Sequence, residues 1–284
     1  MLILAQSLTS CAIKPYVVDQ TAAVLSTQSH APEDDLSLAR EASAFYLKFS
    51  ESVLREAPQH PQLAETVAAG FTQYAYAFVA FEADKLEAQD AKAAQKMRLR
   101  AARLYARARM HAMNALELAS PGFAKTLALA DSTHPLRLNA SQVGLAYWAA
   151  ASWGGMISLS KDDPDQVADL PQVVRLAHLA WQTNPDFGDG ALASLMGTLE
   201  AARPDGSRQQ AAMFFDQAMK VSRAQSAGPW VARAESLALL DQDKEAFERL
   251  LRQALEISAK HKNLQNEVMR ERAEWLLDMM DDLF

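Results

Sequence analysis

The sequence predicts an all-α protein made of stacked helical hairpins, and three observations carry that prediction. Half of the 284 residues are hydrophobic, yet only ten are glycine, which is too few for an all-β fold with many tight turns. Apolar residues recur three and four positions apart, the spacing of one helix face. A short packing signature also repeats along the chain. No change in composition marks a linker, so one continuous helical domain is expected over 11–284.

The first helices are expected where proline and acidic residues give start signals. Pro32 and the acidic residues 33–35 open a helix that runs to about Glu56. Pro61 opens the next one. A long helix rich in Ala, Arg and Leu follows and ends at about Ala119, before a Ser-Pro-Gly sequence. The helix opened by Pro61 carries one apolar stripe, formed by Leu63, Val67, Gly70, Phe71, Tyr74, Phe78 and Phe81.

The second half of the chain predicts shorter helices. Residues 121–140 are the least regular part, and a strongly apolar helix is expected over about 141–159. Later helices are separated by turn residues at 162–164, 184–185, 203–206, 227–229 and 241–243. Short loops between such helices make sequential neighbours antiparallel.

The repeated signature places a small or apolar residue, a second one four positions later, an alanine three further on, and then a large apolar residue. Its copies are Ala108, Ala112, Ala115, Leu116; Val173, Ala177, Ala180, Trp181; Ala211, Phe215, Ala218, Met219; and Phe247, Leu251, Ala254, Leu255. The alanines of the last three copies are 38 residues (Ala180 to Ala218) and 36 residues (Ala218 to Ala254) apart, close to the tetratricopeptide (TPR) period of about 34. Gly154 and Gly197 on the preceding helices are expected to permit close approach. The sequence therefore predicts TPR-like hairpins in an α–α superhelix, the alternative being an Ala-rich bundle that matches by chance.

The single cysteine, Cys11, follows an apolar run at 1–5 and the small residues of Leu8-Thr9-Ser10. This arrangement is typical of the site where a bacterial lipoprotein is cleaved and acylated. We therefore expect residues 1–10 to be a lipoprotein signal segment, shortened because only ten residues without a basic one precede the cysteine, and Cys11 to carry the lipid anchor. The alternative is a buried structural cysteine. No later stretch has the roughly 18 apolar residues of a membrane span, so membrane contact is expected through the anchor alone.

Composition and motifs argue against several other functions. The net charge of −7 disfavours nucleic acid, whose phosphates require a basic face. The six histidines lack the spacing of a metal site, and phosphate-binding and nucleophile-elbow motifs are missing. We expect Gly188–Gly190 to be a turn, and the basic run 98–100 with Arg103 to be a solvated face. No cofactor, no metal and no enzymatic activity are predicted, unless scattered acids and histidines converge in space.

Five residues are the candidates for binding a small ligand. Tyr105 and Arg109 are four positions apart on the long helix and share a face. Arg109 either clamps a carboxylate bidentately or forms a salt bridge. Trp148 and Trp153 lie about 140° apart on one helix, so one of them is expected in the core and the other in a cavity, unless both are core residues. Phe78 is expected to close the same cavity.

A resemblance spans most of the chain. The residues that carry it are 74–79, 103–105, 107–109, 115–117, 147–154, 157–161, 169–171, 272–273, 275–277 and 282–284. In this order they resemble the T-component (TatT) family of TRAP transporters. The resemblance implies TPR-like hairpins, a periplasmic lipoprotein, a homotrimer with a pore through each subunit, and pairing with the transporter's solute-binding protein to deliver a small apolar or organic-acid ligand.

The same resemblance places the family's acylated cysteine on Cys11. Ala12 follows it, where a signal for retention in the inner membrane would have aspartate, so the resemblance implies an outer-membrane address in a Gram-negative cell. A second hypothesis is a TPR scaffold lipoprotein that assists assembly of an outer-membrane complex and holds no small ligand.

Overall fold

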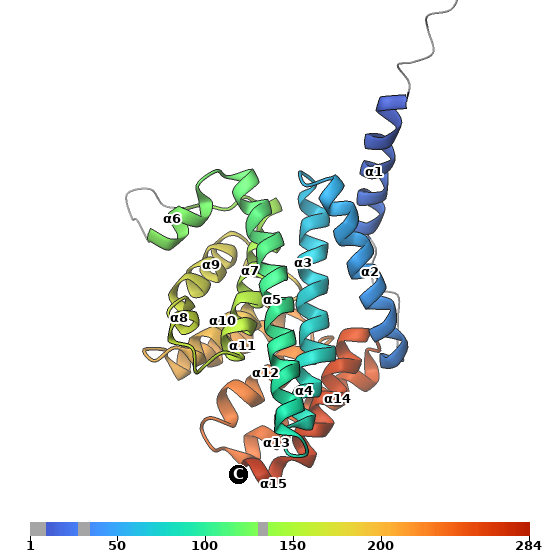
Figure 1. Ribbon diagram of the computed structural model, residues 1–284. Helices are drawn as coiled ribbons and strands as arrows, with labels where there is room; N and C mark the ends of the chain where they lie inside the picture. The colour runs from blue at the N-terminus through green and yellow to red at the C-terminus, as the bar shows by residue number, and fades with distance from the viewer. Residues whose placement is uncertain (1–9, 28–34, 130–135) are drawn as a thin grey trace, which may run out of the picture.

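The computed structural model describes residues 10–27, 35–129 and 136–284. This part of the chain consists of helices and turns without a strand, and the helices pack against one another (Figure 1). The all-α fold class is therefore confirmed. The helices are α1 (Ser10–Thr27), α2 (Leu36–Glu56), α3 (Pro61–Ala75), η1 (Tyr76–Ala80), α4 (Phe81–Leu86), α5 (Ala91–Ala119), α6 (Phe123–Leu129), η2 (Ala140–Gln142), α7 (Val143–Ser158), α8 (Pro164–Val167), α9 (Leu170–Thr183), α10 (Ala191–Ala202), α11 (Arg208–Val221), α12 (Gly228–Arg233), η3 (Ala234–Ala238), α13 (Lys244–Lys260), α14 (Leu264–Asp278) and α15 (Met280–Leu283).

Local capping explains where the helices begin. The sequence predicted acidic residues in the first turn of α2, but Asp35 is its N-cap and stands before the first residue of the helix. The Asp35 carboxylate accepts hydrogen bonds from the first turn of α2 at 2.9 and 3.0 Å, and Asp90 does the same for α5 at 2.9 Å. Pro61 lies in the first turn of α3, and His60 Nδ1 accepts from the N–H of Leu63 at 3.1 Å. Each cap satisfies an amide that has no partner inside the helix.

The repeated signature occupies buried positions of helices α5, α9, α11 and α13. In every copy, the first three positions are buried at 7% exposure or less, whereas the fourth is half-buried in all but Leu116. Burial at these positions lets each helix lie close to its hairpin partner, as the signature predicts. The assignment of the hairpins to the TPR type stays a prediction.

Two helices contain π-helical segments that the sequence did not predict. The apolar stripe opened by Pro61 is interrupted by η1, where the N–H of Phe81 bonds to the carbonyl of Tyr76. In the same way η3 interrupts the helix begun by α12, with the N–H of Leu239 bonded to Ala234. One extra residue per turn shifts the helix face, and such π-bulges occur often at functional sites. A further helix, α6, lies within the region expected to be irregular.

The C-terminal hairpin returns to the N-terminal one. The largest hydrophobic core runs from α1 to α11, and a second core is built by α12 to α15. In Figure 1, α14 lies beside α4, and Lys85 of α4 donates to Glu271 of α14 at 2.6 Å. The last long helix, α14, is therefore tied to the N-terminal part of the fold through α4.

Candidate functional site

Arg109 and Trp153, two of the predicted ligand residues, lie together between α5 and α7. The Arg109 guanidinium lies 4.1 Å from the centre of the Trp153 ring. The indole N–H of Trp153 donates to Asp169 Oδ2 at 3.2 Å, and the other oxygen of Asp169 accepts from Gln172 at 3.1 Å. Arg109, Trp153 and Asp169 thus form one unit at the start of α9, which we call the Arg109 site.

Arg109 is poorly satisfied in this site. Its nearest carboxylate oxygen, on Asp169, is 3.8 Å away, which is too long for a hydrogen bond. Within the described residues it makes no hydrogen bond, although about two-thirds of its side chain is buried. Burial lowers the pKa of Arg109, and Asp169 opposes that shift only in part. The guanidinium is therefore positioned by an aromatic ring and a carboxylate, with its N–H donors still free.

Tyr105, Trp148 and Phe78 make other contacts. Tyr105 is buried against Gly155 of α7, where a Cβ would come within 2.8 Å of the ring, and burial raises its pKa. Trp148 is half-buried, its ring 4.7 Å from that of Tyr147. Phe78 lies in η1 at 7% exposure. Trp153 is the tryptophan in the core, at 5% exposure. The ligand-binding role of these five residues stays a prediction.

The residue that sequence reasoning missed is Arg272 of α14. Its Nη2 and Nε donate to Glu235 of η3 at 2.6–3.2 Å, and its Nη1 donates to Asp84 Oδ2 of α4 at 3.0 Å. Its guanidinium also lies over the rings of three aromatic side chains, Tyr76, Phe81 and Trp275, at 5.0–5.7 Å. We call this group the Arg272 cluster.

The Arg272 cluster is electrostatically complete. Burial by itself lowers the pKa of Arg272, which is 12% exposed, but Glu235 and Asp84 outweigh it and hold that pKa well above the usual arginine value. Burial likewise raises the pKa of Tyr76. Because each guanidinium nitrogen already donates to a carboxylate, the cluster is an internal tie between α14, α4 and the two π-helical segments rather than an open anion site.

Residues of the Arg272 cluster lie in segments that had been singled out in the sequence. Segments 74–79, 103–105, 272–273 and 275–277 were all among the residues that carry the family resemblance. The structure brings Tyr76, Arg272 and Trp275 from these segments into contact. Sequence alone gave no reason to connect them, because Arg272 and Asp84 are 188 residues apart.

A third polar group surrounds Glu51 of α2, which is buried at 2% exposure. It accepts from Arg107 through both oxygens, from Lys48 at 2.6 Å, and it lies 2.9 Å from His111 Nε2. Burial would raise the pKa of Glu51, but these partners outweigh it and lower the pKa to about 2. The group fastens α2 to α5 beside the ring of Phe71.

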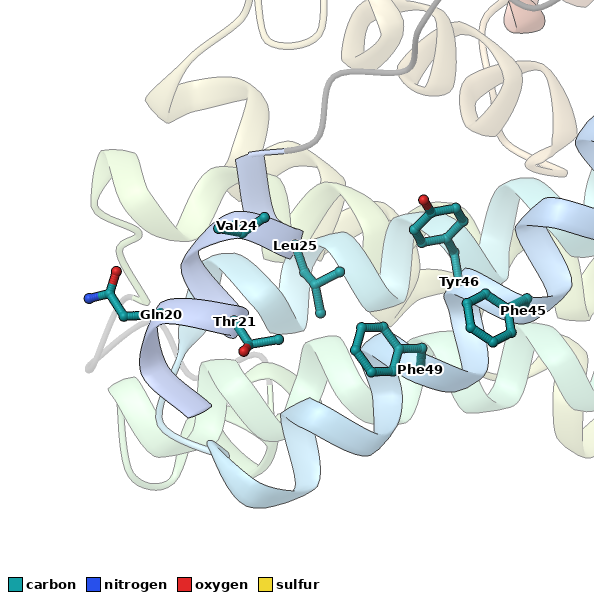
Figure 2. A pocket seen from close by; sticks show the side chains of 7 residues that line it. All are labelled: Gln20, Thr21, Val24, Leu25, Phe45, Tyr46 and Phe49. Atoms are coloured by element: carbon teal, nitrogen blue, oxygen red, sulfur yellow. The ribbon is translucent and has the colours of Figure 1, made fainter. Parts of the chain in front are cut away.

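A groove lies between α1 and α2. Its volume is about 470 Å³, and it is lined by Gln20, Thr21, Val24, Leu25, Phe45, Tyr46 and Phe49. Figure 2 shows Leu25 between the two helices, pointing toward Phe49. Phe45, Tyr46 and Phe49 are 68%, 45% and 43% exposed, which is unusual for aromatic side chains. This volume falls within the range of about 300–1,000 Å³ that is typical of small-molecule sites, but the groove contains none of the five predicted ligand residues.

Most of the predicted signal segment and the side chain of the predicted lipid anchor lie outside the described residues. These are residues 1–9 and the side chain of Cys11, whose backbone belongs to α1. Among the described helices, none has the length and apolarity to cross a bilayer. The same part of the chain gathers no cluster of three or more His, Cys, Asp or Glu suited to a metal ion.

Comparison with known sequences places the chain among transporter components. It belongs to the family described as TRAP transporter T-component, which its sequence matches over residues 32–284. The resemblance noted in the sequence is therefore confirmed, and the chain is an accessory component of a TRAP transport system. It is also 27% identical over 271 residues to a protein of Treponema pallidum (strain Nichols) described as uncharacterized, and the match covers 91% of this chain and 83% of that relative.

Proposed function

We propose that the chain is a non-enzymatic periplasmic lipoprotein that binds the solute-binding protein of a TRAP-type transporter. The observation that carries the proposal is the family match over residues 32–284. Cys11 supports the lipid anchor, because it is the second residue of α1, and the first turn of α1 projects away from the other helices (Figure 1). Ala12 after the cysteine supports an outer-membrane address.

The proposed ligand is a small organic acid or an apolar molecule with one anionic group. Arg109 supports this class, because its guanidinium is held over Trp153 while its N–H donors have no hydrogen-bond partner among the described residues. A carboxylate can accept two of these donors in parallel. Tyr105, one turn away on α5, Trp148 and Phe78 remain the other proposed contacts, and transfer of the ligand requires no covalent chemistry.

The proposed homotrimer needs a subunit contact, and the exposed face of α2 is suited to it. Leu38, Phe45 and Phe49 follow one another at seven and four residues, which places them on one side of the helix. They are 54%, 68% and 43% exposed. Exposed apolar patches of this kind mark interaction surfaces, and we assign this one to a second copy of the chain. Size-exclusion chromatography with light scattering tests it: Phe45→Lys with Phe49→Lys should yield a monomer.

The binding experiment uses the mature protein and the solute-binding protein encoded beside it. Retention of the solute-binding protein on immobilised wild-type protein is expected, and Arg55→Gln, an exposed change on α2, serves as a neutral control. Failure of the wild type to retain it would refute the transporter-partner role. Acylation is tested separately, because Cys11→Ser should abolish labelling by a radioactive fatty acid and release the protein from the membrane fraction.

A structural role without a small ligand is the second candidate. It is favoured by one observation: Tyr105, Trp153 and Phe78 are buried at 4–7% exposure, as expected for packing residues. This hypothesis describes a TPR scaffold lipoprotein for outer-membrane assembly. Native mass spectrometry separates the two, because a co-purifying small molecule that is lost in Arg109→Met supports the ligand-binding role, whereas a ligand-free wild type supports the scaffold.

A further inference from the structure

Helix α5 presents a stripe of unpaired positive charge. Lys92, Lys96, Arg100 and Arg103, here called the basic stripe, follow one another at four, four and three residues. At 100° per residue they fall within an arc of about 80° and extend about 17 Å along the helix. All four side chains are exposed, and within the described residues none of them forms an ion pair or a hydrogen bond.

The other cations of α5 behave differently. Arg98 pairs with Glu87, Arg107 pairs with Glu51, and Arg109 faces Asp169. These three belong to contacts between α5 and other parts of the fold. Among the described residues, the four cations of the basic stripe make no such contact. Packing of α5 against the rest of the fold therefore gives no reason for their charge.

Local helix stability does not account for the stripe either. Like charges three or four positions apart repel one another, and the stripe contains three such neighbouring pairs. Its first residue, Lys92, also lies in the first turn of α5, where the helix dipole disfavours cations. The acidic residue of α5, Glu117, lies near the opposite end of the helix. In a chain with a net charge of −7, an exposed surface of this sign that the fold does not use is suited to an acidic binding partner.

We propose that the basic stripe is the electrostatic docking surface for an acidic face of the transporter's soluble solute-binding protein. The proposal rests on the proposed function, because it names the surface through which that partner is met. Leu99 lies about 20° beyond the edge of this arc and is 52% exposed, so it adds an apolar contact beside the stripe. Complementary charge of this kind steers association and fixes orientation more than it adds affinity.

A soluble partner is favoured over a lipid surface by the position of the stripe. In Figure 1 the first turn of α1, which contains Cys11, and the first turns of α5 lie at opposite ends of the molecule. A chain tethered at Cys11 would therefore hold the stripe away from the membrane to which it is anchored. The net negative charge of the protein also opposes contact with an anionic lipid surface.

The experiment measures binding kinetics between the full mature chain and the solute-binding protein. The stripe variant combines Lys92→Gln, Lys96→Gln, Arg100→Gln and Arg103→Gln. A control variant neutralises four exposed cations on other elements, Lys161, Lys220, Lys260 and Lys262, and so has the same net charge. Surface plasmon resonance at low and at high salt should show about a tenfold or larger fall in the association rate for the stripe variant at low salt, and a weaker salt dependence. The control variant should match the wild type, and thermal unfolding should show that both variants are folded.

The outcomes are distinguishable. If the wild type binds and the stripe variant binds equally well, the stripe is not the docking surface and the inference is overturned while the proposed function stands. If the wild type fails to bind, the proposed function fails. A photo-crosslinker at position 96 in intact cells then tests whether the basic stripe meets an acidic protein partner. A crosslink to an identified protein through an acidic peptide then supports an acidic partner. A crosslink to lipid, stripe-dependent binding to phosphatidylglycerol vesicles, or no crosslink overturns the inference.

Discussion

Arg272 and Arg109 lie in similar surroundings but differ in the hydrogen bonds that they make and in burial, because their side chains are 12% and 33% exposed. Each guanidinium lies over a tryptophan ring, at 5.5 Å in one case and 4.1 Å in the other, and each faces carboxylate. Arg272 donates to Glu235 and Asp84 from all three of its nitrogens, whereas the nearest carboxylate of Arg109 is 3.8 Å away. We expect the number of occupied N–H donors, together with burial, to separate an internal tie from a group available to a ligand.

The pKa directions express the same contrast. Burial lowers the pKa of both arginines. For Arg272 the nearby carboxylates raise the pKa by more than burial lowers it, so the pKa is above the usual arginine value. For Arg109 the more distant Asp169 offsets only part of the effect of burial, so the pKa stays lowered. An anion arriving at Arg109 would supply the missing interaction, whereas one arriving at Arg272 would have to displace Glu235 or Asp84.

The largest expected effect is that of breaking the Arg272 cluster. Arg272→Ala leaves the Glu235 and Asp84 carboxylates without their partner in a half-buried site, and removal of one member of a buried ionic group costs about 3–5 kcal/mol. The free energy of unfolding from urea denaturation should fall by that amount. Arg272→Lys should recover only part of the loss, because an ammonium cannot reproduce the bidentate and stacked geometry.

A matched arginine on α13 provides the control for that measurement. Arg252 pairs with Glu248 at 2.6 Å but is 66% exposed, so Arg252→Ala should change the free energy of unfolding by about 0.5 kcal/mol or less. If Arg272→Ala had an equally small effect, the Arg272 cluster would not tie α14 to α4.

The next effect concerns Tyr105, which lies on α5 one turn before Arg109 and whose electrostatic surroundings include Arg272. In Gly155→Ala the new Cβ would lie 2.8 Å from the Tyr105 ring, and overpacking of this kind costs about 1–3 kcal/mol. Its neighbour Gly154 has no such contact, so the expectation that it permits close helix approach was wrong: the nearest atom to its Cβ would be 3.7 Å away. Gly154→Ala should therefore leave stability unchanged or raise it by up to about 1 kcal/mol. Equal melting temperatures for the two variants would mean that Tyr105 is not held by α7.

In the polar group around Glu51 a buried carboxylate is surrounded by cations, whereas in the Arg272 cluster a buried cation is surrounded by carboxylates. The folded-state pKa of Glu51, about 2, is below its ordinary value of 4.5, so the unfolded chain binds more protons between these values. The stability due to Glu51 is therefore present above about pH 4.5 and is lost as the pH falls toward 2. The loss should be about 1–2 kcal/mol, since Lys48 and Arg107 are partly exposed and screened.

Titration of stability in two variants isolates this contribution. The difference in unfolding free energy between wild type and Glu51→Gln should narrow as the pH is lowered from about 6 to about 3. Glu41→Gln, an exposed change on the same helix, should show no such narrowing. A constant difference for Glu51→Gln would show that its carboxylate titrates normally.

The sequence predicted elements better than contacts between them. The helix class, the start of α3, the end of α5 and the buried alanines of α5, α9, α11 and α13 follow from local rules on capping, spacing and side-chain volume. The π-helical segments do not, because their extra residue is accommodated through tertiary contacts. Arg109 and Trp153 were both identified from sequence, but the distance between them and the 3.8 Å separation from Asp169 depend on how α5, α7 and α9 pack.

The smallest effect on stability, and the sharpest test of the comparison, is expected at Arg109. Arg109→Met keeps the apolar stem and removes a cation that has no hydrogen bond and one long ion pair, so the free energy of unfolding should fall by less than about 1 kcal/mol. Binding of a carboxylate probe should be lost in full. Tryptophan fluorescence titrated with succinate and with octanoate measures this, because Trp153 lies under the guanidinium. Arg103→Met, on the same helix and exposed, should bind as the wild type does. A large loss of stability in Arg109→Met would make Arg109 a second internal tie and remove the distinction from Arg272.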